Sequence, residues 1–192
     1  MRNKISIRPG MYFVLPAALL ILPVRWVFGW VLAVSVHELG HYLALRLCRI
    51  PIDHIEISLS GARMATSELQ GREAVLCALA GPIFGLSLTL LSRFLPCTAF
   101  CGWLQAVFNL LPIYPLDGGR ALRALLSRLC PKEATVNTIE WGIVTLVSAA
   151  CLYLGHRYRL GPIPWGIAAW IFVQKFLANT QDSRYNRGEK LS

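Results

Sequence analysis

Long apolar runs separated by short polar stretches make up most of this 192-residue chain. Six runs stand out by their scarcity of charge, and most approach the roughly 20 residues that an upright membrane-spanning helix needs. They cover residues 10–24, 26–46, 74–94, 99–119, 138–155 and 162–179. The first and fifth runs are short, so their edges are less sharply defined. The pattern predicts an all-α integral membrane protein with about six transmembrane helices.

Residues 50–66 follow a different pattern. Ile55, Ile57 and Leu59 alternate with polar residues, which is typical of a strand, and a Ser-Gly pair that suits a turn follows them. We expect a small β-hairpin near the cytoplasmic face. Its edge would either add an extended substrate strand or only stiffen a loop, and the sequence favours neither alternative.

Composition supports a membrane protein and argues against nucleic-acid binding. The chain is 55% hydrophobic and 15% charged, with mean hydropathy +0.52, whereas soluble domains carry about 25% charged residues. A net charge of +9 would suit a nucleic-acid partner, but nothing resembles a basic recognition helix or a basic stripe interleaved with aromatic residues. The cations instead flank the apolar runs, as expected of a signal that sets membrane orientation.

The distribution of Lys and Arg predicts an orientation. With six spans and a cytoplasmic N-terminus, most cations lie on the cytoplasmic side, and only Arg25, Arg93, Arg157 and Arg159 lie outside. We therefore expect a multi-pass protein of the cell membrane with both termini in the cytoplasm. The domain prediction is a single intramembrane domain over residues 1–180, followed by a polar, disordered tail over 181–192.

The second apolar run contains the pentapeptide His37-Glu38-Leu39-Gly40-His41. Ionisable residues inside a membrane are costly and default to a functional role. Histidines four apart on a helix lie about 40° apart around the axis and about 6 Å along it, so both can reach one metal ion. Neutral imidazoles suit zinc, and the intervening Glu38 is placed to act as a general base. The alternative is a chance match in a helix that satisfies its own polar groups.

A second polar island lies in the fourth run, between residues 109 and 120. Its two prolines cannot both sit in an unbroken helix, so the helix is expected to break there. Asp117 would then fall at a membrane depth similar to that of His41 and complete a zinc site with two histidines. The alternative is that Asp117 only caps a helix beginning at Gly118 or Gly119.

Together these motifs resemble the site-2 protease family, peptidase family M50, of intramembrane zinc metalloproteases. The resemblance rests on the His37–His41 pentapeptide, on Asn109 with the later Pro115-Leu116-Asp117-Gly118, and on Ala80-Gly81-Pro82. It covers a catalytic core of about residues 30–130. It implies that His37, His41 and Asp117 bind Zn²⁺ and that Glu38 activates water. By the same resemblance, Asn109 contacts the substrate strand or the oxyanion.

The spacing after Asn109 is most similar to the sporulation-type branch of the family. Members of that branch process a membrane-tethered sigma-factor precursor and often carry a C-terminal regulatory domain. This chain ends at Ser192, soon after its last apolar run, so we expect that domain to be absent. Gly85 also departs from the Asn that often follows Ala-Gly-Pro in the family. The partners implied are a membrane protein substrate, the lipid bilayer of a bacterial cell and a regulatory membrane protein.

The predicted function is therefore hydrolysis of a peptide bond in or near a transmembrane segment of a membrane-tethered substrate, such as a sigma-factor precursor or an anti-sigma factor. Two alternatives belong to other classes. A membrane metal transporter would bind its cargo at His37, His41 and Asp117, but transporters usually show paired repeats and none is visible. A catalytically silent pseudoprotease that binds membrane segments would have no need of Glu38.

Overall fold

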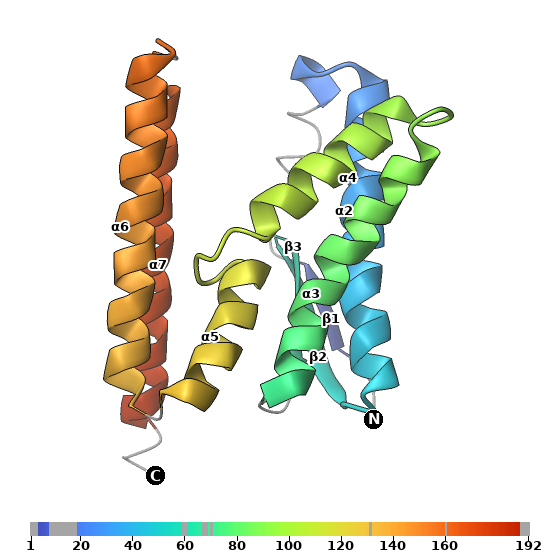
Figure 1. The fold of residues 1–192 in the computed structure, drawn as a ribbon. Helices are drawn as coiled ribbons and strands as arrows, with labels where there is room; N and C mark the ends of the chain where they lie inside the picture. Colours follow the sequence, from blue (N-terminus) through green and yellow to red (C-terminus); the bar gives the residue numbers. More distant parts are fainter. Residues whose placement is uncertain are drawn as a thin grey trace. The chain divides into compact units, whose positions relative to one another are not determined.

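The computed structural model describes residues 4–7, 19–58, 61–66, 69, 71–130, 132–159 and 161–188. These residues are mostly helical, with one small sheet (Figure 1). The chain divides into two compact units, Met1–Leu110 and Leu111–Ser192, and each is described by itself. The single domain expected over residues 1–180 stays a prediction.

The helices of the first unit are built from the second, third and fourth apolar runs. They are α2 (Val24–Leu47), α3 (Gly71–Ser87), which continues into the 3₁₀ turn η1 (Leu88–Leu91), and α4 (Pro96–Asn109). Helix α2 packs against both α3 and α4, and α3 also packs against α4. Small residues allow this close approach: a Cβ at Gly40 would lie 2.6 Å from the carbonyl oxygen of Ala80 on α3.

A three-stranded sheet joins the first unit, with strands β1 (Lys4–Ile7), β2 (Ile52–Ser58) and β3 (Gly61–Thr66) in the order β1-β2-β3. Strands β2 and β3 are antiparallel, with a register irregularity between Ile52 and His54. They fall in the stretch expected to form a hairpin. Their connection lies outside the described residues, so the hairpin as a whole stays a prediction.

Strand β1 corrects the expectation of an all-α fold around one hairpin. It pairs with β2 in parallel, Ile5 opposite Ile55, and makes β2 the central strand. Four residues are too few for periodicity to show a strand. A parallel pair also requires a long crossover connection, so the partner of β1 is remote in the sequence.

The second unit contains α5 (Asp117–Leu129), α6 (Glu133–Arg157) and α7 (Ile163–Gly188). Helices α6 and α7 lie side by side, and α5 contacts α6 (Figure 1). Ile113, from the segment before α5, is buried with Val144 of α6 and Ile171 of α7. The fourth apolar run is therefore not one helix but is divided between α4 and α5, as its prolines predict.

The disordered tail expected over residues 181–192 stays a prediction, although α7 continues to Gly188 and so includes residues 181–188. A polar composition argued for disorder there. A helix that has already nucleated extends at little cost through residues of fair helix propensity, such as Gln, Arg and Tyr. Residues 189–192 lie outside the described part of the chain.

Two helices in the described residues are long and apolar enough to cross a membrane. They are Gly71–Leu91 and Glu133–Arg157, and Ile163–Leu177 is a shorter apolar helix. Most of the first apolar run lies outside the described residues. The six spans therefore stay a prediction.

Candidate metal centre

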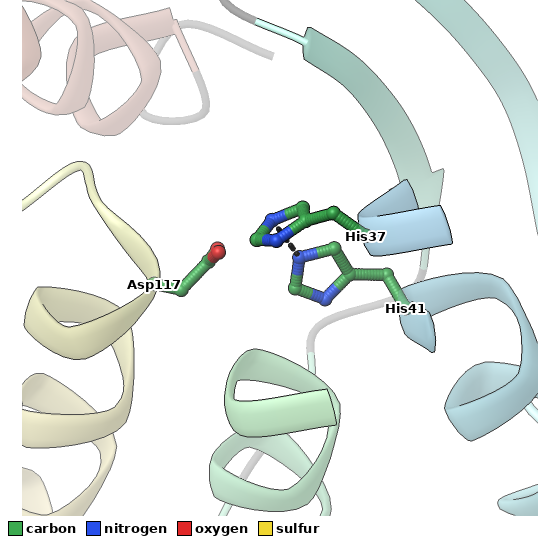
Figure 2. A group of neighbouring side chains, drawn as sticks. All are labelled: His37, His41 and Asp117. Atoms are coloured by element: carbon green, nitrogen blue, oxygen red, sulfur yellow. Dashed lines mark hydrogen bonds between the residues drawn. The ribbon is translucent and has the colours of Figure 1, made fainter. Parts of the chain in front are cut away.

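His37 and His41 lie one turn apart on α2, and their rings converge (Figure 2). Their Nε2 atoms are 3.2 Å apart and their ring centroids 4.8 Å apart. The side chain of His37 is buried, with 3% of its surface exposed. Two imidazole nitrogens thus point to one place on a largely apolar helix.

A backbone carbonyl determines which ring nitrogen of His41 carries the proton. The ring atom Nδ1 of His41 lies 2.7 Å from the carbonyl oxygen of Cys77 on α3. A carbonyl can only accept a hydrogen bond, so Nδ1 carries the proton and donates it. The lone pair of Nε2 is then directed toward His37. Histidines that bind metals are usually oriented by a bond of this kind on their other ring nitrogen.

Helix α3 provides the space for both rings. A Cβ at Gly81 would lie 2.2 Å from Nε2 of His41, and a Cβ at Gly85 would lie 3.8 Å from Nδ1 of His37. The sequence singled out Ala80-Gly81-Pro82 only as part of a resemblance. The structure gives Gly81 a physical role, because any larger residue there would occupy the position of the His41 ring.

Asn109, the last residue of α4, lies beside the histidine pair. Its side-chain Nδ2 is 3.5 Å from Nε2 of His37, at the long limit of a hydrogen bond. The pairing brings a residue from α4 to a site on α2, although 72 positions separate them.

Glu38 follows His37 on α2 and is half-buried. Successive residues of a helix are about 100° apart, which places Glu38 about 60° from His41 around the axis. Its carboxylate therefore belongs to the same side of α2 as the His41 ring.

Asp117 is the first residue of α5, and its side chain is buried, with 7% exposed. The N-cap position of α5 is Leu116, one residue earlier. The alternative that Asp117 is the cap of a helix starting at Gly118 or Gly119 therefore does not describe this helix.

Two imidazoles and one carboxylate, the side-chain chemistry of His37, His41 and Asp117, are ligand types that zinc prefers. Two nitrogens bound about 2.0–2.1 Å from one tetrahedral zinc ion would be about 3.4 Å apart. The 3.2 Å between the two Nε2 atoms is close to that value. The histidine pair therefore fits zinc in chemistry and in spacing.

Three comparisons with known proteins relate this chain to peptidase family M50 and to site-2 proteases. The family model of peptidase family M50 matches residues 87–151, a stretch that contains Asn109 and Asp117. A curated relative, the zinc metalloprotease MJ0392 of Methanocaldococcus jannaschii, is 29% identical over 110 residues, covering 50% of this chain and 32% of that protein. A solved site-2 protease from M. jannaschii has TM-score 0.62 and 20% identity, over 86% of this chain and 84% of that one. These findings support a relationship between this chain and peptidase family M50.

The three comparisons cover different parts of the chain. The family-model match begins at residue 87 and does not include the two histidines. The structural likeness, at 20% identity, shows a shared fold alone. The chain spans less than two thirds of the curated relative, whose activity as a whole protein therefore enters only as a proposal.

Proposed function

We propose that this chain is an intramembrane zinc metalloprotease that cleaves a peptide bond in or near a transmembrane segment of a membrane-tethered substrate. The observation that carries the proposal is the convergence of His37 and His41, 3.2 Å apart at Nε2, with the His41 proton fixed by a backbone carbonyl. Two neutral imidazoles directed at one point form half of a zinc site.

Asp117 is proposed as the third ligand. A carboxylate is one of the ligand types that zinc accepts, and two histidines with one aspartate leave the fourth position of zinc open for chemistry. Bound zinc would supply a Lewis acid that polarises the scissile carbonyl and makes water a nucleophile near neutral pH.

Glu38 is proposed as the general base and then the general acid. Its carboxylate accepts a proton from the attacking water while the oxygen–carbon bond forms at the scissile carbonyl. When the carbon–nitrogen bond breaks, Glu38 returns that proton to the leaving nitrogen, so Glu38 is again a carboxylate and the products are a carboxylic acid and an amine. The amide of Asn109 is proposed to steady the oxyanion, since a positioned donor of this kind stabilises developing charge.

The membrane setting is also proposed. Two described helices are long and apolar enough to span a bilayer, and large apolar side chains such as Phe28, Phe94 and Trp165 are exposed, which is unusual for a soluble protein. The proposed topology has six spans, with both termini in the cytoplasm of a bacterial cell. The proposed substrates are a sigma-factor precursor or an anti-sigma factor, as in the sporulation-type branch, with a regulatory membrane protein as a further partner.

The test compares zinc content and cleavage for the purified wild type, Glu38→Gln and Glu133→Gln, using a panel of tethered sigma-factor precursors and single-span regulators. Glu133 is a matched control because it is 75% exposed at the start of α6. We expect zinc in all three proteins and cleavage by the wild type and Glu133→Gln but not by Glu38→Gln.

Other outcomes would favour the other classes. Cleavage by Glu38→Gln would remove the general base from the mechanism. Zinc uptake into vesicles without cleavage of any substrate would favour a metal transporter, and binding of substrates by wild type and Glu38→Gln alike without cleavage would favour a pseudoprotease. Absence of zinc from the wild type would overturn the metal centre.

A further inference from the structure

Two opposite charges are buried together away from the histidines. Glu140 on α6 and Lys175 on α7 are 2% and 1% exposed, and Nζ of Lys175 donates a hydrogen bond to Oε2 of Glu140. Lys175 is among the largest fully buried side chains in the described residues. Ionisable residues in the interior of a helix bundle are expensive to bury and usually have a function. The proposed mechanism gives this pair no role.

The pair is connected to the segment that carries Asp117. Oε1 of Glu140 lies 3.8 Å from Nε of Arg123 on α5. The guanidinium of Arg123 lies over the Tyr114 ring, 4.7 Å from its centroid, and Nζ of Lys175 lies 5.7 Å from the same centroid. The face of an aromatic ring attracts cations at such distances. Tyr114, three residues before Asp117, is therefore contacted by cations from α5 and α7.

The segment before α5 also packs tightly against the first turn of that helix. A Cβ at Gly119 would lie 2.2 Å from both the carbonyl carbon of Ile113 and the backbone nitrogen of Tyr114. Ile113 is itself buried against Val144 of α6 and Ile171 of α7. A shift of Tyr114 would therefore be passed to the first turn of α5 through backbone contact.

We propose that Glu140 and Lys175 position Asp117, acting through Arg123 and Tyr114. They are positioning residues and not catalytic ones. An apolar pair would also fill the space between α6 and α7, but it would attract neither the guanidinium of Arg123 nor the ring of Tyr114. The charges thus select one arrangement of Tyr114 and the first turn of α5. The proposal rests on the proposed function, in which Asp117 binds zinc.

The experiment separates positioning from stability with a double variant, Glu140→Leu with Lys175→Met. Replacing both members of a buried ion pair by apolar residues is often neutral or stabilising, whereas replacing one strands a charge. Thermal melting in detergent and helical circular dichroism check that the variant folds. Glu133→Gln is the control, because Glu133 also lies 3.8 Å from Arg123 but is 75% exposed.

Zinc affinity, measured by competition with a chelator, is the first readout. Loss of a group that orients a metal ligand typically weakens binding about 10–100-fold, so we expect a folded double variant to bind zinc at least about tenfold more weakly. The Glu133→Gln control should bind zinc as the wild type does. Unchanged affinity in the folded double variant would overturn the positioning role and leave a purely structural pair.

Amide hydrogen exchange over residues 113–121 is the second readout, and it does not depend on zinc. We expect faster exchange in this segment of the double variant and unchanged exchange in the control. If the wild type binds no zinc, the proposed function fails, and the exchange data alone decide whether the pair holds Tyr114 and the first turn of α5. Equal exchange in wild type and double variant would then overturn the proposal.

Discussion

At the scale of single residues, the histidine pair depends on what surrounds it as much as on its own spacing. The i, i+4 pattern predicts that both rings lie on one side of α2. The carbonyl of Cys77 and the bare backbone of Gly81 then determine how the His41 ring is oriented. Neither could be predicted from the sequence, because a backbone carbonyl and a missing Cβ leave no pattern in the residues of α2 itself.

Gly81→Ala is expected to disrupt this arrangement. The new Cβ would fall 2.2 Å from Nε2 of His41, so the ring must rotate and its bond to Cys77 must lengthen. Zinc affinity should fall by about tenfold or more, the size of effect seen when ligand orientation is lost. Chelator competition on purified protein measures this.

Gly142→Ala is the matched control for that change, since a Cβ at Gly142 on α6 meets nothing within 4 Å. It should leave zinc affinity unchanged and stabilise the helix by up to about 1 kcal/mol. Equal zinc affinity in Gly81→Ala and Gly142→Ala would mean that α3 does not constrain the His41 ring.

At the scale of elements, apolar runs predict the helices well and the strands poorly. Helices α2, α3, α6 and α7 each correspond to one run, because each run is continuous. The prolines of the fourth run correctly predict a break before Asp117. The sequence does not predict strand β1, because a short strand depends on pairing and the partner of β1 is the remote strand β2.

The packing of α2 on α3 leads to a prediction at this scale. In Gly40→Ala the added Cβ would lie 2.6 Å from the carbonyl oxygen of Ala80, which is backbone and cannot rotate away. The two helices must separate, and we expect a loss of about 1–3 kcal/mol in the free energy of unfolding, as for other overpacked cores. A lower midpoint of thermal unfolding in detergent would report it.

Gly166→Ala serves as the reference, since a Cβ at Gly166 on α7 meets nothing within 4 Å. Its melting midpoint should equal or exceed that of the wild type. A Gly40→Ala protein that melts no lower than this reference would show that α2 and α3 can separate without penalty.

At the scale of the whole molecule, the distribution of Lys and Arg along the chain predicts its orientation in the membrane, which no single residue can do. In the six-span topology that the sequence predicts, most Lys and Arg would lie on the cytoplasmic side. A green fluorescent protein fused after Ser192 should therefore fluoresce, and alkaline phosphatase fused there should be inactive, because both reporters would lie in the cytoplasm. Phosphatase inserted after Arg159, in the turn between α6 and α7, should be active. The reverse pattern would invert the orientation.

The pairing of β1 with β2 restricts how many times the chain between them can cross a membrane. Strands that share hydrogen bonds cannot lie on opposite sides of a bilayer, so in a membrane-spanning chain Lys4–Ile7 and Ile52–Ser58 would face the same side. The chain that joins them must then traverse the bilayer an even number of times. If α2 is one traverse, the proposed topology needs a second before it, for which the sequence offers the apolar run 10–24. An odd number of crossings between Ile7 and Ile52 is incompatible with this sheet.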